Sequence, residues 1–318
     1  MLRAIKSFIH MLSLDQKSCE EYCRQRRLLR FEKYGGRIRF LALHTLAHRI
    51  LVPIFKLYIA GEKKKLIIVK DSRKKTDKPK IFCPTHIGGM DVEMSFIAIK
   101  EPCIFLLGDP RELYRTMDGF MLQLSGVIPV DVDSKEDRAA AKATMVDVLR
   151  KGGNLFLFPE GVQNISPNAL LGKLFPGAVE LAITCGAEIV PIAIHKDKGT
   201  YYVSIGENIS YEGYSVEDKI KLTRELRDHM ATLKWKIIES LPMIDHSDVT
   251  QKVYEEMIND IFNMNTEYTW TMEDIKKGMY REEGVTPPEE AFTFMDKLVP
   301  SKDNAFLYNK TSVPYCEA

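Results

Sequence analysis

Short apolar runs alternate with longer stretches of helical spacing between residues 64 and 206. The runs are rich in β-branched residues and have the length of strands. Strand–helix alternation is typical of an α/β fold, so we expect a mixed, largely parallel sheet flanked by helices. The expected strands are Leu66–Val69, Ile81–Cys83, Cys103–Leu107, Val127–Val130, Leu155–Phe158, Ile189–Ile194 and Tyr201–Ile205.

Capping signals mark the ends of several helices. Ser134 with Asp137, and Ser215 with Asp218, have the spacing of capping boxes. Glycines stop two of the helices, because glycine readily adopts the left-handed conformation that ends a helix. After Gly206 only helical stretches follow, which predicts a helical C-terminal extension of unknown role. The expected helices are 134–150, 176–186 and 215–241, with shorter ones at 248–263, 271–282 and 288–297.

Residues 40–59 form an amphipathic helical stretch near the N-terminus. One face is apolar and the other polar, and Pro53 allows a kink. Such a helix either packs on the protein's own core or lies in the headgroup layer of a membrane. The sequence contains no run of 18 uncharged apolar residues, so we expect no membrane-spanning helix. The apolar face carries Leu43, Ala47, Ile50, Leu51, Ile54, Phe55 and Tyr58, and the polar side carries Thr45, His48, Arg49 and Lys56.

Charge is unevenly distributed along the chain, although the formal net charge is only +1. Residues 1–80 carry 21 Lys and Arg against 7 Asp and Glu, and the remainder carries 24 against 37. This asymmetry points to an anionic partner, either a membrane surface or nucleic acid. Few aromatic residues interleave the basic segment 63–80, which disfavours nucleic acid. Basic residues on both sides of the amphipathic stretch instead favour peripheral binding to an anionic membrane, on its cytoplasmic face.

The rest of the composition excludes several classes of protein. With 45% hydrophobic and 28% charged residues, the chain is neither collagen-like nor disordered. Its six cysteines include no C-x2-C pair, which predicts neither a zinc site nor a disulfide scaffold. His44 and His48 have helical metal spacing but lack a third ligand nearby. No P-loop or dinucleotide fingerprint occurs, so we expect no metal and no cofactor.

Two polar motifs follow predicted strands. His86 and Asp91 stand in Cys83-Pro84-Thr85-His86-Ile87-Gly88-Gly89-Met90-Asp91, where the glycines predict a loop that can fold the carboxylate back to the imidazole. A histidine held in this way can take a proton from a hydroxyl, although the spacing alone also fits a structural histidine. Glu160, in Phe158-Pro159-Glu160-Gly161, follows another strand, at the usual ligand-binding edge of open α/β sheets.

In order and spacing, these motifs resemble the glycerolipid acyltransferases, the family of 1-acylglycerol-3-phosphate acyltransferases. The resemblance covers residues 80–200 and includes Gly126–Asp131 and Val190-Pro191. It implies acyl transfer from acyl-CoA or acyl-carrier protein to a lysophospholipid hydroxyl. His86 would be the general base, oriented by Asp91, and Glu160 with Gly161 would bind the acceptor or shape the site. The absence of G-x-S-x-G agrees with a nucleophile that the substrate supplies.

Two departures from the family pattern concern the acceptor. An arginine is missing after Val130-Asp131, and Val162-Gln163-Asn164 replaces the usual Thr-Arg-Ser. Both changes remove cations that suit a phosphate monoester. Arg111 and Lys173 are candidate replacements, as are Arg115 and Arg138.

The acceptor therefore remains open between 1-acylglycerol-3-phosphate and glycerol-3-phosphate, another lysophospholipid or an amine-bearing lipid. A non-catalytic lipid-binding relative is the alternative from another class of function. We expect three regions: a basic amphipathic membrane-binding segment at 1–62, an acyltransferase domain at 63–206, and the helical extension at 207–318.

Overall fold

The structure is a computed structural model that describes most of the chain up to residue 264. The described residues are 2–38, 41–108, 114–116, 120, 126–164, 169–242, 246–248, 250–264, 299 and 301–302. Contacts divide the chain into two units, Met1–Met279 and Tyr280–Ala318. All the elements that follow belong to the first unit.

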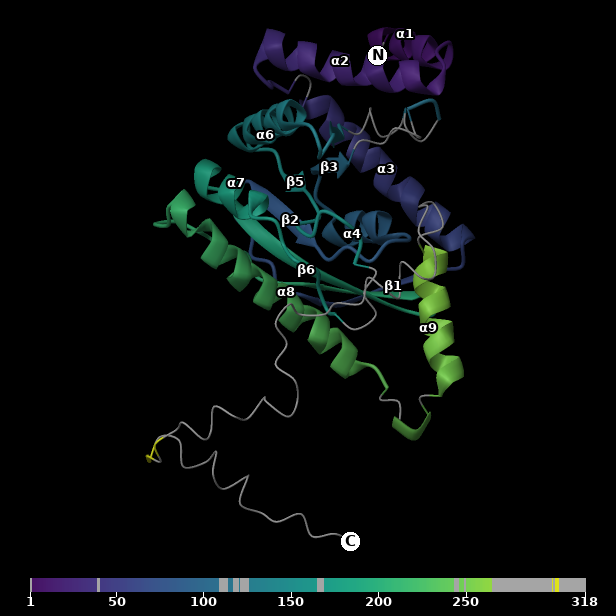
Figure 1. Cartoon of the computed structure of the whole chain (residues 1–318), viewed down its shortest axis with the longest axis vertical. Helices are drawn as coiled ribbons and strands as arrows, with labels where there is room; N and C mark the ends of the chain where they lie inside the picture. Colours follow the sequence, from purple (N-terminus) through teal and green to yellow (C-terminus); the bar gives the residue numbers. More distant parts are fainter. Residues whose placement is uncertain are drawn as a thin grey trace. The chain divides into compact units, whose positions relative to one another are not determined.

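A seven-stranded sheet forms the centre of this unit, with the strand order β1-β7-β6-β2-β5-β3-β4 (Figure 1). Every neighbouring pair is parallel except β6 and β7, which are antiparallel. The predicted α/β fold with a mixed, largely parallel sheet is therefore confirmed. The strands are β1 (Lys65–Asp71), β2 (Lys80–Pro84), β3 (Ile104–Gly108), β4 (Ile128–Val130), β5 (Leu155–Phe156), β6 (Glu188–Asp197) and β7 (Thr200–Ile205).

Helices cover both faces of the sheet. The predicted N-cap at Ser134 is present, since its hydroxyl accepts from the N–H of Asp137. The capping box of Ser215 and Asp218 is also present, one turn before α8. The helices predicted at 271–282 and 288–297 lie outside the described residues. The helices are α1 (Leu2–Leu12), α2 (Gln16–Tyr34), α3 (Leu41–Gly61), α4 (Asp91–Ile99), α6 (Lys135–Arg150), α7 (Gly177–Cys185), α8 (Lys219–Ser240) and α9 (Gln251–Met264), with 3-10 turns at Val216–Asp218 and His246–Asp248.

Alternation along the strands gives the sheet two chemically different faces. Ile81 and Leu155 point to an aliphatic core that α6, α7 and α8 cover. Their neighbours Phe82 and Phe156, with Phe105 of β3, point to an aromatic core that α3 and α4 cover. Successive residues of a strand face opposite sides of the sheet, so the pairing of β2 with β5 aligns the aliphatic residues on one face and the aromatic residues on the other. Because both faces of the inner strands β2 and β5 are buried, these strands read as continuous apolar runs.

Only part of the apolar face predicted for residues 40–59 is buried in α3. Leu51 is buried and Phe55 packs against the aromatic core, whereas Ile50 and Ile54 are exposed. His48 was predicted on the polar side, and this prediction was wrong: it is 4% exposed and packs edge-on against Phe96, with 4.8 Å between ring centroids. The helix uses the His48 side to close the core, because that side faces α4.

An ion pair attaches the N-terminal helices to the α/β domain. Arg27 of α2 donates to both carboxylate oxygens of Asp137, which is 1% exposed at the start of α6. The same carboxylate accepts the N–H of Asp131 at the end of β4. A buried carboxylate needs such partners, since burial without them is costly. The buried ion pair of Arg27 and Asp137 thus joins residues 1–62 to the α/β domain.

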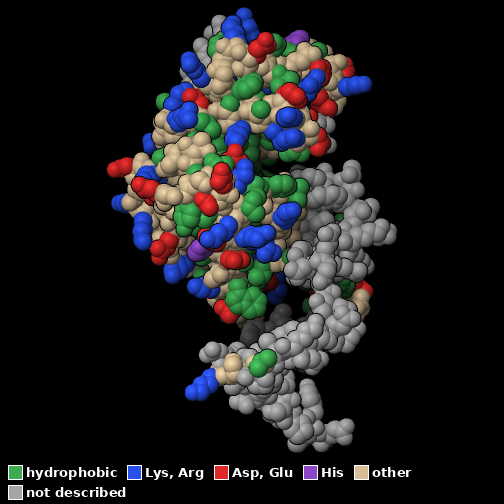
Figure 2. All heavy atoms as spheres, turned by 60° about the vertical axis from the view of Figure 1, so that its left-hand side comes forward, with side chains coloured by type: hydrophobic (Ala, Val, Ile, Leu, Met, Phe, Trp, Pro, Cys, Tyr) green, Lys and Arg blue, Asp and Glu red, His purple; other side chains and the backbone are tan. Residues whose placement is uncertain are grey.

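Surface charge is mixed over the face that Figure 2 turns forward, where basic and acidic side chains are interspersed. Within the described residues, no helix combines the length and the apolar character needed to cross a bilayer. The N-terminal helices nevertheless expose large apolar side chains, which are considered below with the function.

Candidate active site

His86 and Asp91 meet at the carboxyl end of β2. Gly88 and Gly89 have positive φ angles of 83° and 63°, a conformation that favours glycine, and they turn the chain into α4. Asp91 is the first residue of that helix and is 1% exposed. Its Oδ2 lies 2.8 Å from Nδ1 of His86 and also accepts the N–H groups of Ile87 and Gly88. The loop therefore folds the carboxylate back onto the imidazole.

This contact defines which imidazole nitrogen can react. Oδ2 of Asp91 accepts two backbone N–H groups and faces Nδ1 of His86 in the same way, as a hydrogen-bond acceptor. Nδ1 of His86 then carries the proton that it donates to Asp91, which leaves Nε2 as the basic nitrogen. The His86 side chain is 16% exposed, so it is held on one side and accessible on the other. This arrangement suits proton abstraction from a hydroxyl.

Glu160 lies beside His86 because β2 and β5 are parallel neighbours whose carboxyl ends meet. It is 3% exposed, and its two oxygens accept different main-chain groups. Oε1 accepts the N–H of His86 at 2.8 Å, and Oε2 accepts the N–H of Gly172 at 2.7 Å. Burial raises the pKa of Glu160, and these two hydrogen bonds oppose that rise. The geometry makes Glu160 part of the site's architecture, with both oxygens engaged by the protein.

Two further contacts to His86 come from the segment that follows β5. The ring of Phe158 stacks on the imidazole, with centroids 3.8 Å apart and planes within 10°. The N–H of Asn164 donates to the carbonyl of His86 at 2.8 Å. Sequence reasoning missed both. Alternation along β5 could have indicated Phe158, since it falls on the same face as Phe156, but a main-chain contact such as that of Asn164 has no side-chain signal.

The other predicted acceptor residues lie around this cluster. Gly161 has a φ of 72°, and a Cβ there would come within 2.7 Å of the Phe175 ring, so the position requires glycine. Lys173 is exposed and follows Gly172 directly. Arg138 donates to the carbonyl of Val132, just beyond β4. Arg111 lies outside the described residues.

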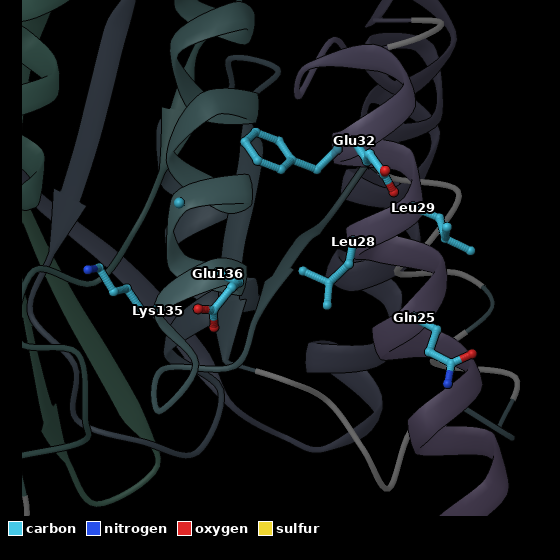
Figure 3. Close-up of a pocket in the computed structure, with 8 residues that line it drawn as sticks. Gln25, Leu28, Leu29, Glu32, Lys135 and Glu136 are labelled. Carbon is cyan, nitrogen blue, oxygen red and sulfur yellow. The ribbon is translucent and has the colours of Figure 1, made fainter.

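An open apolar groove of about 640 Å³ lies elsewhere, between α2 and α6 (Figure 3). Leu28 points across it toward Glu136 of α6, and Lys135 of the same helix also lines the groove. None of the residues around His86 lines it. Among the described residues there is no group of three or more histidine, cysteine or acidic side chains that could hold a metal ion.

Comparisons with known proteins address this domain directly. A family model described as Acyltransferase matches residues 66–195, which include His86, Asp91 and Glu160. A 1-acyl-sn-glycerol-3-phosphate acyltransferase from Borreliella burgdorferi is 25% identical over 195 residues, or 59% of this chain and 75% of that protein. Residues 66–195 therefore match an acyltransferase domain, and this chain is similar to the glycerolipid acyltransferases. The predicted resemblance is thus confirmed, and the protein is an acyltransferase.

Two further relatives have lower sequence identity to this acyltransferase. The chloroplastic 1-acyl-sn-glycerol-3-phosphate acyltransferase LPAT1 of Arabidopsis thaliana is 22% identical over 173 residues, which span 52% of this chain and 44% of that protein. The crystal structure of the 1-acyl-sn-glycerophosphate (LPA) acyltransferase PlsC from Thermotoga maritima matches with a TM-score of 0.46 and 16% identity. That match covers 76% of this chain and 91% of the PlsC chain. A structural similarity of this size adds nothing to the family assignment.

Proposed function

We propose that this acyltransferase moves a fatty acyl group from an acyl thioester to the hydroxyl of a lysophospholipid, most simply converting 1-acylglycerol-3-phosphate to phosphatidate. The observation that carries the proposal is the 2.8 Å contact between Nδ1 of His86 and Oδ2 of Asp91. It supports His86 as a general base whose Nε2 faces the acceptor. The donor would be acyl-CoA or acyl-carrier protein.

The reaction needs one proton relay. Nε2 of His86 takes the proton of the acceptor hydroxyl while its oxygen attacks the thioester carbonyl, forming a C–O bond. Asp91 stabilises the imidazolium that results, as the carboxylate of a catalytic triad does. The tetrahedral intermediate then collapses, the C–S bond breaks, and the imidazolium returns its proton to the leaving thiolate. No covalent intermediate on the enzyme is required.

An assay of thiol release tests this proposal. Purified protein is given acyl-CoA or acyl-acyl-carrier protein together with 1-acylglycerol-3-phosphate, other lysophospholipids, glycerol-3-phosphate or an amine-bearing lipid. We expect turnover with 1-acylglycerol-3-phosphate, and loss of about 10²-fold or more in His86→Ala, from the usual contribution of a general base. His229→Ala, which removes an exposed histidine on α8, serves as the matched control.

Three outcomes would change the proposal. Turnover with only another acceptor would keep the chemistry and replace the substrate, as the missing arginines at the Val132 and Gln163 positions allow. Equal activity of His86→Ala and wild type would refute His86 as the base. Lipid binding without turnover on any acceptor would favour a non-catalytic lipid-binding protein.

The exposed apolar side chains of α1 and α3 support action at a membrane surface. On α3 they recur every three or four residues, opposite the side that packs on the aromatic core. A helix with one face in the protein core and an apolar outer face suits the interface of a bilayer. The members of this outer stripe are Leu43, Leu46, Ile50, Ile54 and Leu57, and α1 adds Ile5, Ile9 and Leu12.

The charge of the same region selects the kind of membrane. Residues 1–80 have three times as many basic as acidic side chains, 21 against 7, and Arg49 and Lys56 of α3 are exposed. Cations beside an apolar stripe favour anionic lipid, because each gains attraction near a negative surface. The protein would therefore bind peripherally to an anionic leaflet such as the cytoplasmic face of a membrane.

A further inference from the structure

The helix α8 contacts the connection between β5 and α7 (residues 157–176), although it lies outside the segment that the family model matches. It packs against β6 and β7 on the side of the aliphatic core (Figure 1). Leu226 and Met230 are buried in that core, so the middle of the helix is fixed against the sheet. Arg227 directly follows Leu226 and is half-buried, so its guanidinium group projects from a fixed backbone.

Arg227 donates two hydrogen bonds to successive carbonyl groups of the β5–α7 connection. Its Nε lies 3.3 Å from the carbonyl oxygen of Gly172, and its Nη2 lies 3.5 Å from that of Leu171. The planar guanidinium group presents its donors as a rigid fork, which allows it to bind two acceptors at once. In the part of the chain that the structure describes, Arg227 forms no ion pair, so these two carbonyls are its polar partners.

Gly172 connects this contact to the active site. Its N–H donates to Oε2 of Glu160 at 2.7 Å, and a Cβ at this position would lie 3.1 Å from the same oxygen. The other oxygen of Glu160 accepts the N–H of His86 at 2.8 Å. Three successive contacts therefore lead from Arg227 to the main chain of His86. Because the Gly172 backbone lies so close to the carboxylate, a shift of Gly172 would change the contact with Glu160.

The base of the β5–α7 connection is fixed by a different contact. The N–H of Phe175 donates to the carbonyl of Pro159 at 2.8 Å, which closes the connection into a loop. Gly172 lies inside this loop, three residues before Phe175, where its peptide groups need partners of their own. Arg227 supplies such a partner from α8, on the carbonyl side of Gly172.

We propose that Arg227 is a positioning residue for acyl transfer: by binding the carbonyls of Leu171 and Gly172, it fixes the N–H that holds Glu160, and Glu160 in turn holds the main chain of His86. The effect on catalysis rests on the proposed role of His86 as general base. The effect on the N–H groups of Gly172 and His86 does not depend on that role, and it can be measured separately.

Steady-state kinetics of a matched pair of variants tests the effect on catalysis. Arg227→Met removes the guanidinium group and retains an unbranched apolar stem. We expect kcat to fall by about tenfold, which corresponds to the loss of a hydrogen bond from a charged donor. The KM for the acceptor should change less, because Arg227 acts on the position of the base. Arg224→Met makes the same substitution at an exposed position one turn earlier on α8 and should retain the kcat of wild type.

Two kinetic results would overturn the proposal. One is an unchanged kcat in Arg227→Met, and the other is an equal loss in Arg224→Met.

A double-mutant cycle tests whether Arg227 acts through Glu160. In Glu160→Gln the amide N–H₂ replaces one oxygen, so one of the two main-chain N–H groups loses its acceptor. The double variant with Arg227→Met should lose little more kcat than Glu160→Gln alone, because both changes interrupt the same series of contacts. Losses that multiply in the double variant would show that Arg227 acts by another route.

Hydrogen exchange tests the proposal without any turnover. Peptides that contain the N–H groups of His86 and Gly172 should exchange faster in Arg227→Met than in wild type, and Arg224→Met should match wild type. Peptides of β3 (Ile104–Gly108) provide an internal reference that should not change. Unchanged protection of the first two groups, or equally faster exchange in β3, would refute a local positioning role.

The exchange result also separates this proposal from the proposed function. If wild type transfers no acyl group but protection at His86 and Gly172 falls in Arg227→Met, the proposed function fails while the link from Arg227 to the His86 main chain stands. If wild type is active and protection is unchanged in Arg227→Met, the proposed function stands and the role of Arg227 fails.

Discussion

The phenyl ring of Phe158 lies flat on the imidazole of His86, 3.8 Å away between centroids. One face of the imidazole is thus covered, and its edge is held by Asp91 through Nδ1. A ring face attracts a cation, so the stack stabilises the imidazolium that forms when His86 takes a proton. The ring also fixes the plane in which Nε2 can meet a hydroxyl.

Replacing Phe158 by leucine should therefore slow the chemical step. We expect kcat to fall by roughly 3- to 30-fold, since a cation over an aromatic face is stabilised by about 0.5–2 kcal/mol. KM should change less, because the ring contacts the base. Phe158→Tyr retains the aromatic face and serves as the control. A leucine variant with the kcat of wild type would show that the stack has no part in catalysis.

Asp91→Asn should be far more damaging than its size suggests. Oδ2 accepts three donors in the native protein, and an amide group cannot accept all of them and also retain the tautomer of His86. A loss of about 10³-fold or more in kcat is expected, comparable to the loss of the orienting carboxylate in other histidine-dependent enzymes.

The melting temperature of Asp91→Asn should also fall, because the N–H groups of Ile87 and Gly88 lose a buried acceptor. Steady-state kinetics and thermal unfolding measure both effects. Asp228→Asn, an exposed change on α8, is the control. Near-native activity of Asp91→Asn would be incompatible with an orienting role for this carboxylate.

His48 should make the protein less stable in acid. Burial lowers its pKa to about 4, against 6.5 for an ordinary histidine, so the folded state keeps it neutral while the unfolded chain protonates it. Between these two values the unfolded state binds more protons. The free energy of unfolding therefore falls as pH decreases from about 6.5 to about 4, by up to about 3 kcal/mol.

Urea unfolding at pH 7, 6 and 5 checks this effect. His48→Leu should lack this part of the decrease, because leucine has no proton to gain, and the exposed His229→Leu should retain it. If His48→Leu and wild type lose the same free energy over this pH range, the buried imidazole is not responsible.

The outer stripe of α3 should control membrane binding. Ile50→Asp with Leu57→Asp places two charges on exposed positions, so we expect little change in melting temperature. Binding to anionic vesicles in flotation should fall by at least about tenfold, because insertion of two large apolar side chains is lost.

Wild-type binding should also decrease with salt and be weaker on zwitterionic vesicles. Ile220→Asp, on the exposed side of α8, provides the matched control. If binding depends neither on salt nor on lipid charge, an electrostatic contribution to membrane binding is contradicted. An unchanged affinity of the α3 variant would move the contact to another surface.

Local patterns were sufficient for most of the secondary structure. Alternating runs placed the strands, and Ser134 and Ser215 marked helix starts that the structure confirms. The predicted strand Leu155–Phe158 is shorter in the structure, where β5 ends at Phe156. Phe158 leaves the hydrogen-bonded ladder there and reaches His86. A strand end is decided by its neighbours in the sheet, which the local pattern does not contain.

The site was only partly predictable for the same reason. His86 and Asp91 are five residues apart, and the two glycines between them predict a turn that brings them together. Glu160 could be placed at a strand end, but its two partners follow from the adjacency of β2 and β5 and from the path of the chain to Gly172. The contact of Arg227 on α8 with the carbonyls of Leu171 and Gly172 had no sequence signal at all, because one basic residue in a long helix resembles any other.

The sequence by itself determined the resemblance to the glycerolipid acyltransferases, the order of strands and helices, and the His86–Asp91 motif, since all of these depend on residue type and short-range spacing. Only the tertiary structure decided which side of α3 closes the core, why His48 is buried, and how α8 reaches the Glu160 loop. These features arise where segments far apart in the chain pack together. These contacts are stabilised by burial and by charges brought close in space, and the local sequence pattern indicates neither.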